Sequence, residues 1–282
     1  MYMTECRAMA GEISAFAAYL QREEKSRATV AKYMSDVERF VAFVGGRDIS
    51  KEIVLDYKGV LERCHAATGA NAVLAAVNSF LRFLGKGDCC VRQFRVQRRA
   101  YRAAERELTK AEYLRLINAA QRQENQRLSL LLQTICGTGI RVSELRCITV
   151  EAVRMGEASV SCKSKTRKVF FVTSLRKKLL RYAKEKGIDK GEIFVTATGR
   201  SMDRSNIWRE MKALCKQAGV SPEKVFPHNL RHLFARTFYG IEKDIAKLAD
   251  LLGHSSINTT RIYIATTGAE HRRKMENMHL IL

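Results

Sequence analysis

One arginine-dense stretch interrupts the apolar periodicity of this 282-residue chain and constrains how it can fold. The segment RQFRVQRRAYRAAER, residues 92–106, contains six arginines and a single acidic residue, and it has no apolar stripe. A chain of this length exceeds the usual size of one domain, so such a segment predicts a boundary between two separate cores. A solvated run of charge is the alternative, but an arginine-rich hinge in a basic protein favours contact with a DNA backbone.

The residues before this stretch have the spacing of helices and little strand character. Apolar residues recur three or four positions apart in four runs, near residues 13–20, 30–43, 50–61 and 71–84. Ser50 is suited to begin the third helix, and paired or nearby glycines follow the second and fourth. The pattern predicts a four-helix domain over residues 8–90, followed by a basic linker over residues 91–107.

The second part of the chain, residues 108–282, predicts a mainly helical domain with a small β-sheet, an α+β fold. Thr109 is expected to begin the first helix, and the β-rich runs ASVSC and VFFVT flank KSKTRK, which predicts a hairpin with a basic tip. EIFVT predicts one more short strand. Further helices are expected near residues 174–186, 203–218, 228–239, 242–252 and 256–264, with an amphipathic helix at the C-terminus.

The charge of the chain points to a polyanionic partner. Lysine and arginine number 50 against 29 acidic residues, which gives a formal net charge of +21. The apolar stretches, such as residues 128–136, are too short and too interrupted to span a membrane, so nucleic acid is favoured. The eight cysteines show no metal-ligand spacing, and the N-terminus has no signal-peptide pattern. We therefore expect no metal, and a cytoplasmic protein with reduced thiols.

Two positions in the first half of the second domain could carry chemistry. Arg141 follows the turn sequence GTGI, where a cation gains nothing from the helix dipole, so the position favours an anion ligand. The alternative is an ion pair with Glu144, one turn further on. Lys163 closes the first strand of the predicted hairpin, where a lysine can enter a DNA groove or protonate a leaving oxygen. A purely solvated lysine is the alternative.

Three more candidates lie near the C-terminus. His228 and Arg231 are three residues apart and so share a helix face that could meet a phosphate, whereas His232 is expected on another face. His254 follows the helix-ending Gly253, and Tyr263 comes nine residues later. The segment IAKLADLLGHSSINTTRIY also fits a helix-turn-helix, which makes a non-catalytic DNA-binding regulator the alternative function.

These residues together contain what a metal-free attack on a phosphodiester needs. A tyrosine oxygen is both a nucleophile and a tolerable leaving group, so a covalent intermediate on it is reversible. Two arginines can stabilise the charge that develops on the non-bridging oxygens, and a lysine can protonate the departing alkoxide. The helix-turn-helix interpretation leaves most of these residues without a role.

The order of the motifs resembles the tyrosine recombinase (phage integrase) family over nearly the whole chain. GTGIRVSEL is similar to the first arginine motif of the family, CKSKTRKVFFV to the hairpin lysine, HNLRH to the HxxR motif, and LLGHSSINTTRIY to the histidine and nucleophile motif. The resemblance implies a supporting Glu144 and a catalytic set made up of Arg141, Lys163, His228, Arg231, His254 and Tyr263, with Tyr263 as the nucleophile. Lys165 is the alternative for the lysine.

The resemblance also implies an assembly. It predicts a helical, SAM-like core-binding domain and a catalytic domain that together clamp double-stranded DNA, with phosphate contacts from Arg95, Arg98, Arg99, Arg102 and Lys165. The protein is expected to be a monomer or weak oligomer without DNA and a homo-tetramer on two recombination sites, where it exchanges strands through a Holliday junction. A C-terminal helix that docks onto the neighbouring protomer is expected, as is a nucleoid location.

The resemblance also indicates the type of family member and its additional components. The chain resembles the short Xer-like and mobile-element members, and we expect no arm-binding domain before the first helix. No cofactor is expected, and an accessory DNA-bending or directionality protein is compatible with the family. A type IB topoisomerase and a hairpin-forming resolvase share the chemistry and are the nearest enzymatic alternatives.

Overall fold

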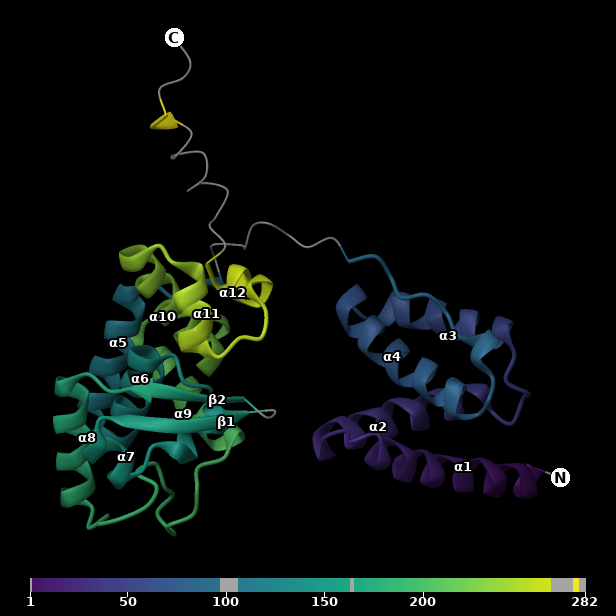
Figure 1. Ribbon diagram of the computed structural model, residues 1–282, viewed down its shortest axis with the longest axis horizontal. Helices are drawn as coiled ribbons and strands as arrows, with labels where there is room; N and C mark the ends of the chain where they lie inside the picture. The colour runs from purple at the N-terminus through teal and green to yellow at the C-terminus, as the bar shows by residue number, and fades with distance from the viewer. Residues whose placement is uncertain (1, 97–105, 163–164, 265–275, 279–282) are drawn as a thin grey trace. The chain divides into compact units, whose positions relative to one another are not determined.

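The computed structural model describes residues 2–96, 106–162, 165–264 and 276–278, which form two compact units (Figure 1). The first unit spans Met1–Arg98 and the second spans Arg99–Leu282. None of the helices within the described ranges is both long enough and apolar enough to cross a membrane. The expected C-terminal amphipathic helix falls mostly on residues 265–282, of which only 276–278 are described.

The first unit is a bundle of four helices, as the periodicity predicted. The helices are α1 (Tyr2–Arg22), α2 (Arg27–Val44), α3 (Lys51–Cys64) and α4 (Ala67–Phe83). Phe16, Phe40 and Phe80 are fully buried, and the rings of Phe16 and Phe80 meet edge to face at 5.1 Å. The hydroxyl of Ser50 caps α3 by accepting the backbone N–H of Ile53, which confirms the predicted start of this helix.

Two asparagines of α4 hold the chain that follows this helix. The Asn78 side chain donates to the carbonyl of Val91 at 2.8 Å and accepts its N–H at 3.0 Å. Asn71 does the same for Phe94, at 2.9 and 2.7 Å. Because the two asparagines lie seven residues apart, they occupy one face of the helix. The chain from Val91 to Phe94 therefore runs along α4, secured by reciprocal backbone pairs.

The second unit is mainly helical and contains one two-stranded sheet (Figure 1). Its elements in order are α5 (Lys110–Arg122), α6 (Gln126–Thr138), η3 (Val142–Cys147), α7 (Val150–Met155), β1 (Glu157–Cys162), β2 (Lys165–Phe170), α8 (Thr173–Glu185), α9 (Arg204–Ala218), η4 (Pro222–Lys224), α10 (Pro227–Glu242), α11 (Ile245–Leu252) and α12 (Ile257–Ile264). Thr109 and Glu112 form a reciprocal capping box, which confirms Thr109 as the start of α5. The core of this unit lies around α6, where Leu131, Leu132 and Ile135 are fully buried.

The predicted hairpin is present, but its basic tip is shorter than expected. β1 and β2 pair antiparallel, with Cys162 opposite Lys165 and Val160 opposite Arg167. Four residues assigned to the tip, 165–168, therefore belong to β2. The alternation explains the error, because Thr166, Lys168 and Phe170 are exposed and Arg167 and Val169 point toward the core. A strand with one polar face looks like a basic loop when its charged residues are counted without their period.

The strand predicted for EIFVT is not formed within the described residues. Its place is taken by isolated bridges that join Thr149 to Glu192 and Val195 to Ser201. Ile193 still donates its N–H to the carbonyl of Ile148 at 3.0 Å and is fully buried. The segment thus contributes a core residue, but its backbone pairing is too short to form the predicted strand.

Candidate active site

Tyr263 lies at the centre of a cluster of three histidines. Its α12 helix packs against α10 and α11, and only 6% of the residue is exposed. The phenolic oxygen is 3.2 Å from Nε2 of His228, and the rings of His232 and His254 lie 4.0 and 4.8 Å from the phenol ring. The structure therefore brings both predicted histidines to the predicted nucleophile.

His232 is also part of this cluster, which contradicts the sequence expectation. It was expected on a different helix face from His228, yet its buried ring stacks on Tyr263. The reason is helical geometry: residues four apart on α10 return to the same side of the helix. Its position four residues after His228 was a sufficient signal, and the prediction about its face was wrong.

Arg231 is buried beneath the cluster, with 1% of the residue exposed. Its guanidinium donates to the carbonyl of Gly139, to that of Leu252 at 2.5 Å, and to Nε2 of His254 at 3.1 Å. Those two carbonyls end α6 and α11, where the partial negative charge of a helix is greatest. Two helix C-termini thus stabilise this cation.

The charge of Arg231 is only partly compensated. Burial first, and then the nearby Arg141 cation, lower its pKa to about 10, which still leaves the group protonated at neutral pH. Within the described residues it forms no ion pair with a carboxylate, and its Nε has no hydrogen-bond partner. A buried cation of this kind favours an anionic ligand.

Two glycines in the left-handed region allow this packing. Gly139 has a φ of +65°, and a Cβ there would lie 2.5 Å from the ring of Phe234. Gly253 has a φ of +64°, and a Cβ there would lie 2.5 Å from Cδ of Arg167. Both positions need glycine for conformation and for space. The carbonyls of these glycines accept hydrogen bonds from Arg231 and Arg141, respectively.

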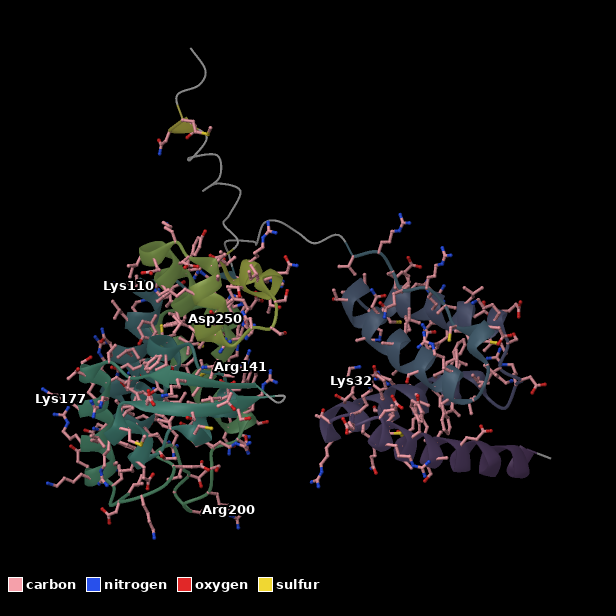
Figure 2. The ribbon with its side chains drawn as sticks, in the orientation of Figure 1. Lys32, Lys110, Arg141, Lys177, Arg200 and Asp250 are labelled. Carbon is pink, nitrogen blue, oxygen red and sulfur yellow. The ribbon has the colours of Figure 1, made fainter. Side chains whose placement is uncertain are left out.

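Arg141 lies at the start of η3 and forms the ion pair that was its alternative interpretation. Its side chain donates to Oε1 of Glu144 at 2.8 Å and to the carbonyl of Gly253 at 3.2 Å, and about a third of it remains exposed. Figure 2 shows Arg141 near the hairpin, on the opposite side of this unit from Lys177 of α8. The ion pair and an anion-binding role are compatible, because the exposed part of the guanidinium can still meet a phosphate.

Glu144 has a second cationic partner that the sequence analysis missed. Arg167 on β2 donates to Oε2 of Glu144 at 2.6 Å, and only 11% of the Arg167 side chain is exposed. Arg167 is one of four cations in the segment KSKTRK, so the composition of this segment did not distinguish it from its neighbours. The period-two pattern of β2 was the available clue.

Thr260 and Arg231 fix the orientation of His254. A guanidinium can only donate, so Nε2 of His254 accepts from Arg231 and Nδ1–H donates to Oγ1 of Thr260 at 2.8 Å. Burial and the surrounding cations, Arg231 first, lower the pKa of His254 to about 4. His254 is therefore neutral at physiological pH. Thr260 is a fully buried polar residue three positions before Tyr263, a spacing that could have identified it.

For several predicted residues the structure describes no contact with this site. Lys163 lies outside the described residues, as do Arg98, Arg99 and Arg102. Lys165 begins β2, and its side chain is not described. Arg95 is an exposed residue of the first unit.

A comparison of the sequence with known protein families agrees with this arrangement. Residues 106–270, which include every element of the cluster, match the Phage integrase family. The chain belongs to this family. As a member it is a tyrosine recombinase, an enzyme that breaks and rejoins DNA, and this displaces the non-catalytic regulator as an interpretation.

The similarity to Xer recombinases extends over nearly the full length. The chain is 30% identical over 279 residues to the tyrosine recombinase XerC of Roseiflexus castenholzii, covering 89% of this chain and 88% of that protein. It is 26% identical to the tyrosine recombinase XerA of Pyrococcus furiosus, covering 94% and 93% of the two chains. The recombinase is thus Xer-like in both of its units.

Solved structures show the same fold. The crystal structure of XerA recombinase aligns over 97% of this chain and 99% of its own, with a TM-score of 0.55 and 26% identity. A lambda integrase dimer bound to a COC′ core site aligns over 90% of this chain and 94% of its own, with a TM-score of 0.73 and 18% identity. A lambda integrase tetramer has been solved on a Holliday junction, with a TM-score of 0.71 over 90% of this chain and 76% of its own.

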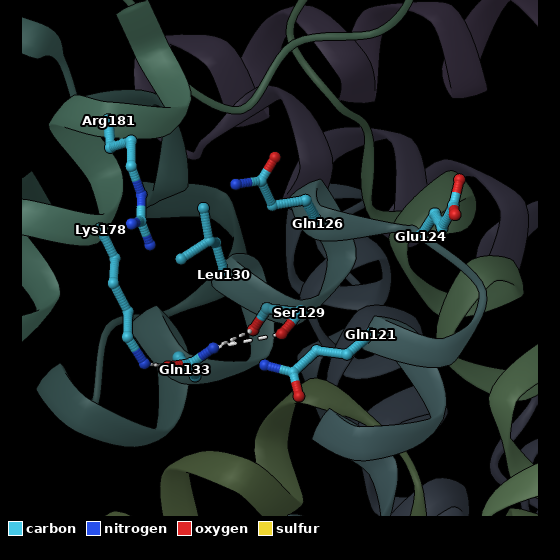
Figure 3. Close-up of a pocket in the computed structure, with 8 residues that line it drawn as sticks. All are labelled: Gln121, Glu124, Gln126, Ser129, Leu130, Gln133, Lys178 and Arg181. Carbon is cyan, nitrogen blue, oxygen red and sulfur yellow. Dashed lines mark hydrogen bonds between the residues drawn. The ribbon is translucent and has the colours of Figure 1, made fainter. Parts of the chain in front are cut away.

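A surface cavity is a separate feature of the recombinase. A cavity of about 330 Å³ lies at α5, α6 and α8 (Figure 3), lined by Gln121, Glu124, Gln126, Ser129, Leu130, Gln133, Lys178 and Arg181. None of these residues belongs to the Tyr263 cluster.

Among the described residues, no group of three or more His, Cys, Asp or Glu side chains could hold a metal ion.

Proposed function

We propose that Tyr263 cleaves DNA through a 3′-phosphotyrosyl intermediate. In this step the phenolic oxygen attacks the scissile phosphorus, the bond from phosphorus to the 5′-oxygen breaks, and the phosphate becomes joined to Tyr263. Attack by a 5′-hydroxyl reverses the step, so no ATP is needed. The observation that carries this proposal is the convergence of His228, Arg231 and His254 on the phenol of Tyr263.

The arginines supply transition-state stabilisation. Arg141 and Arg231 bind the non-bridging oxygens, where negative charge builds up as the phosphorus becomes five-coordinate. Arg231 is suited to this role because it is fixed by two helix ends and forms no ion pair with a carboxylate of the described residues. Glu144 supports Arg141 by accepting from both its backbone and its side chain, at 2.9 and 2.8 Å.

The remaining residues move or hold protons. His228 accepts the phenolic proton as Tyr263 attacks, since its Nε2 already shares a hydrogen bond with the hydroxyl. Lys163 protonates the departing 5′-oxygen, a role that follows from the family motif alone. His254 stays neutral, and once DNA displaces its contact with Arg231 it takes up the tautomer with the proton on Nε2: the Thr260 hydroxyl then donates to Nδ1, and Nε2–H donates to a phosphate oxygen.

The active form of the recombinase is a homo-tetramer that holds two DNA sites and exchanges strands through a Holliday junction. The lambda integrase structures on a core site and on a junction support this assembly by analogy of fold. In it, the basic residues between the two units contact the DNA backbone, and the C-terminal segment docks onto a neighbouring protomer. A charge of +21 favours the close approach of several protomers to the phosphates.

A suicide substrate tests the proposal. A duplex is first selected from a randomised library for specific binding, and a nick is then placed just 3′ of each candidate scissile phosphate so that the short product strand is lost. We expect a denaturation-resistant protein–DNA adduct with the wild type and none with Tyr263→Phe, which keeps the ring but removes the nucleophilic oxygen. An adduct in Tyr263→Phe, or tight specific binding without any adduct in the wild type, contradicts it.

A further inference from the structure

One carboxylate joins two arginines from different elements beside the cluster. Glu144, with 4% of the residue exposed, accepts from the Arg141 side chain through Oε1 and from Arg167 through Oε2, at 2.8 and 2.6 Å. Oε2 also accepts the backbone N–H of Arg141 at 2.9 Å. Every bond here involves a charged group, and such bonds are the shorter and stronger kind.

Gly253 completes this arrangement. Its carbonyl accepts from the Arg141 guanidinium at 3.2 Å, and its missing side chain leaves room for the methylene chain of Arg167. Helix α11, which Gly253 ends, also contacts β2, which carries Arg167. Arg167 therefore packs against Gly253, which precedes His254. It also donates a hydrogen bond to Glu144, the residue that holds Arg141.

The charge of the group explains why a second arginine is useful. A lone Glu144–Arg141 pair would have no net charge, so the carboxylate would cancel much of the attraction of Arg141 for a phosphate. With Arg167 the three groups carry a net charge of +1, and the carboxylate is held from both sides. The Arg167 cation also helps to lower the pKa of His254, after burial, Arg231 and Arg141.

We propose that Arg167 is a positioning residue for DNA cleavage: it holds the Glu144 carboxylate so that Glu144 fixes Arg141 against the scissile phosphate without neutralising it. The inference rests on the proposed roles of Arg141 and Tyr263. Arg167 itself need not touch the DNA. Its contribution is made through the geometry and the net charge of the group.

The test compares Arg167→Ala and Arg167→Lys with the matched control Lys168→Ala. Lys168 is the next residue of β2, and its ion pair with Glu157 lies on the exposed side of the hairpin. On the suicide substrate we expect Arg167→Ala to form the adduct about 10- to 100-fold more slowly, with Kd for DNA changed less than about threefold. Arg167→Lys should recover part of the rate because it keeps the charge. Lys168→Ala should stay within about twofold of the wild type.

A titration separates positioning from simple loss of stability. The imidazole signals of His254, followed by NMR, should titrate at higher pH in Arg167→Ala than in the wild type, and at the same pH in Lys168→Ala. In a protein that already carries Glu144→Gln, Arg167→Ala should slow adduct formation much less, because Arg167 acts through the Glu144 carboxylate. If Arg167→Ala does not fold, the same comparison is made with Arg167→Lys, which keeps a cation at the buried position.

The outcomes are distinct. Arg167 variants that cleave at the wild-type rate, or that slow cleavage equally with and without the Glu144 carboxylate, overturn this inference. An adduct formed by Tyr263→Phe would instead overturn the proposed function. Loss of the adduct in Tyr263→Phe together with an unaffected Arg167→Ala would leave the proposed function standing and remove only the role of Arg167.

Discussion

The hydroxyl of Tyr263 lies 3.2 Å from Nε2 of His228, and the rest of the phenol is buried while His228 itself is exposed. The pair thus connects an enclosed oxygen to a ring that exchanges protons with solvent. A phenol is a weak acid, so attack at neutral pH benefits from a nearby base. His228 is placed to be that base before DNA arrives.

Replacing His228 should therefore slow cleavage more than it weakens DNA binding. We expect His228→Gln to reduce the rate of adduct formation about 100-fold at pH 7, with a smaller defect at pH 9, where hydroxide is more abundant as an alternative base. Quench experiments on the suicide substrate measure both rates. His65→Gln, at an exposed histidine of the first unit, is the control. A defect in His228→Gln that is equal at both pH values would argue against a base.

The left-handed glycines predict a graded loss of stability. Gly139→Ala should lower the free energy of unfolding by about 3 kcal/mol, because it combines backbone strain with a clash against Phe234. Gly219→Ala is the matched control: its φ is +60° and no atom lies within 4 Å of the added Cβ, so only about 1 kcal/mol of strain is expected. Urea unfolding measures the difference. Equal losses would mean that the space around Gly139 relaxes freely.

The sequence was sufficient for most of the helices, for the presence of the hairpin and for the order of the candidate site residues, since periodicity and capping are local properties. It was not sufficient for what surrounds Arg231. Its acceptors are the carbonyls of Gly139 and Leu252, and every residue has a carbonyl, so no pattern distinguishes those two. Arg167 was missed for a related reason: a count of cations does not show which side of a strand each one occupies.

The pKa of His254 predicts how stability depends on pH. This pKa is lowered to about 4 in the folded protein and is near 6.5 in the unfolded chain, so the unfolded chain binds more protons between these values. Stability conferred by the neutral ring is complete above about pH 6.5 and is lost as the pH falls toward 4. Relative to His254→Gln, the wild type should lose about 1 kcal/mol between pH 7 and pH 5, since solvent screens the half-buried ring.

Urea unfolding of both proteins at each pH measures this difference. His65→Gln should follow the wild type, because its ring is exposed. Parallel stability curves for the wild type and His254→Gln from pH 7 to pH 5 would contradict the lowered pKa.

The incompletely compensated charge of Arg231 predicts stabilisation by a simple anion. Inorganic phosphate should raise the Tm of the wild type by a few degrees above sodium chloride of equal ionic strength, because a ligand that binds only the folded state stabilises it. Arg141→Ala should lose most of this shift, and Arg95→Ala should keep it. Calorimetry with each variant in both salts provides the measurement. A shift that survives in Arg141→Ala would assign the phosphate effect to other cations.

The two helix ends that hold Arg231 are far apart in the chain. Gly139 closes α6 and Leu252 closes α11, and the arginine between them comes from α10. These three segments meet only when α6, α10 and α11 have packed together. A chain that is still folding, or one that has lost α11, therefore has a tyrosine but lacks the phosphate site that we propose. The same packing that completes the fold thus acts as a safeguard, since it withholds the ability to cut DNA from incomplete molecules.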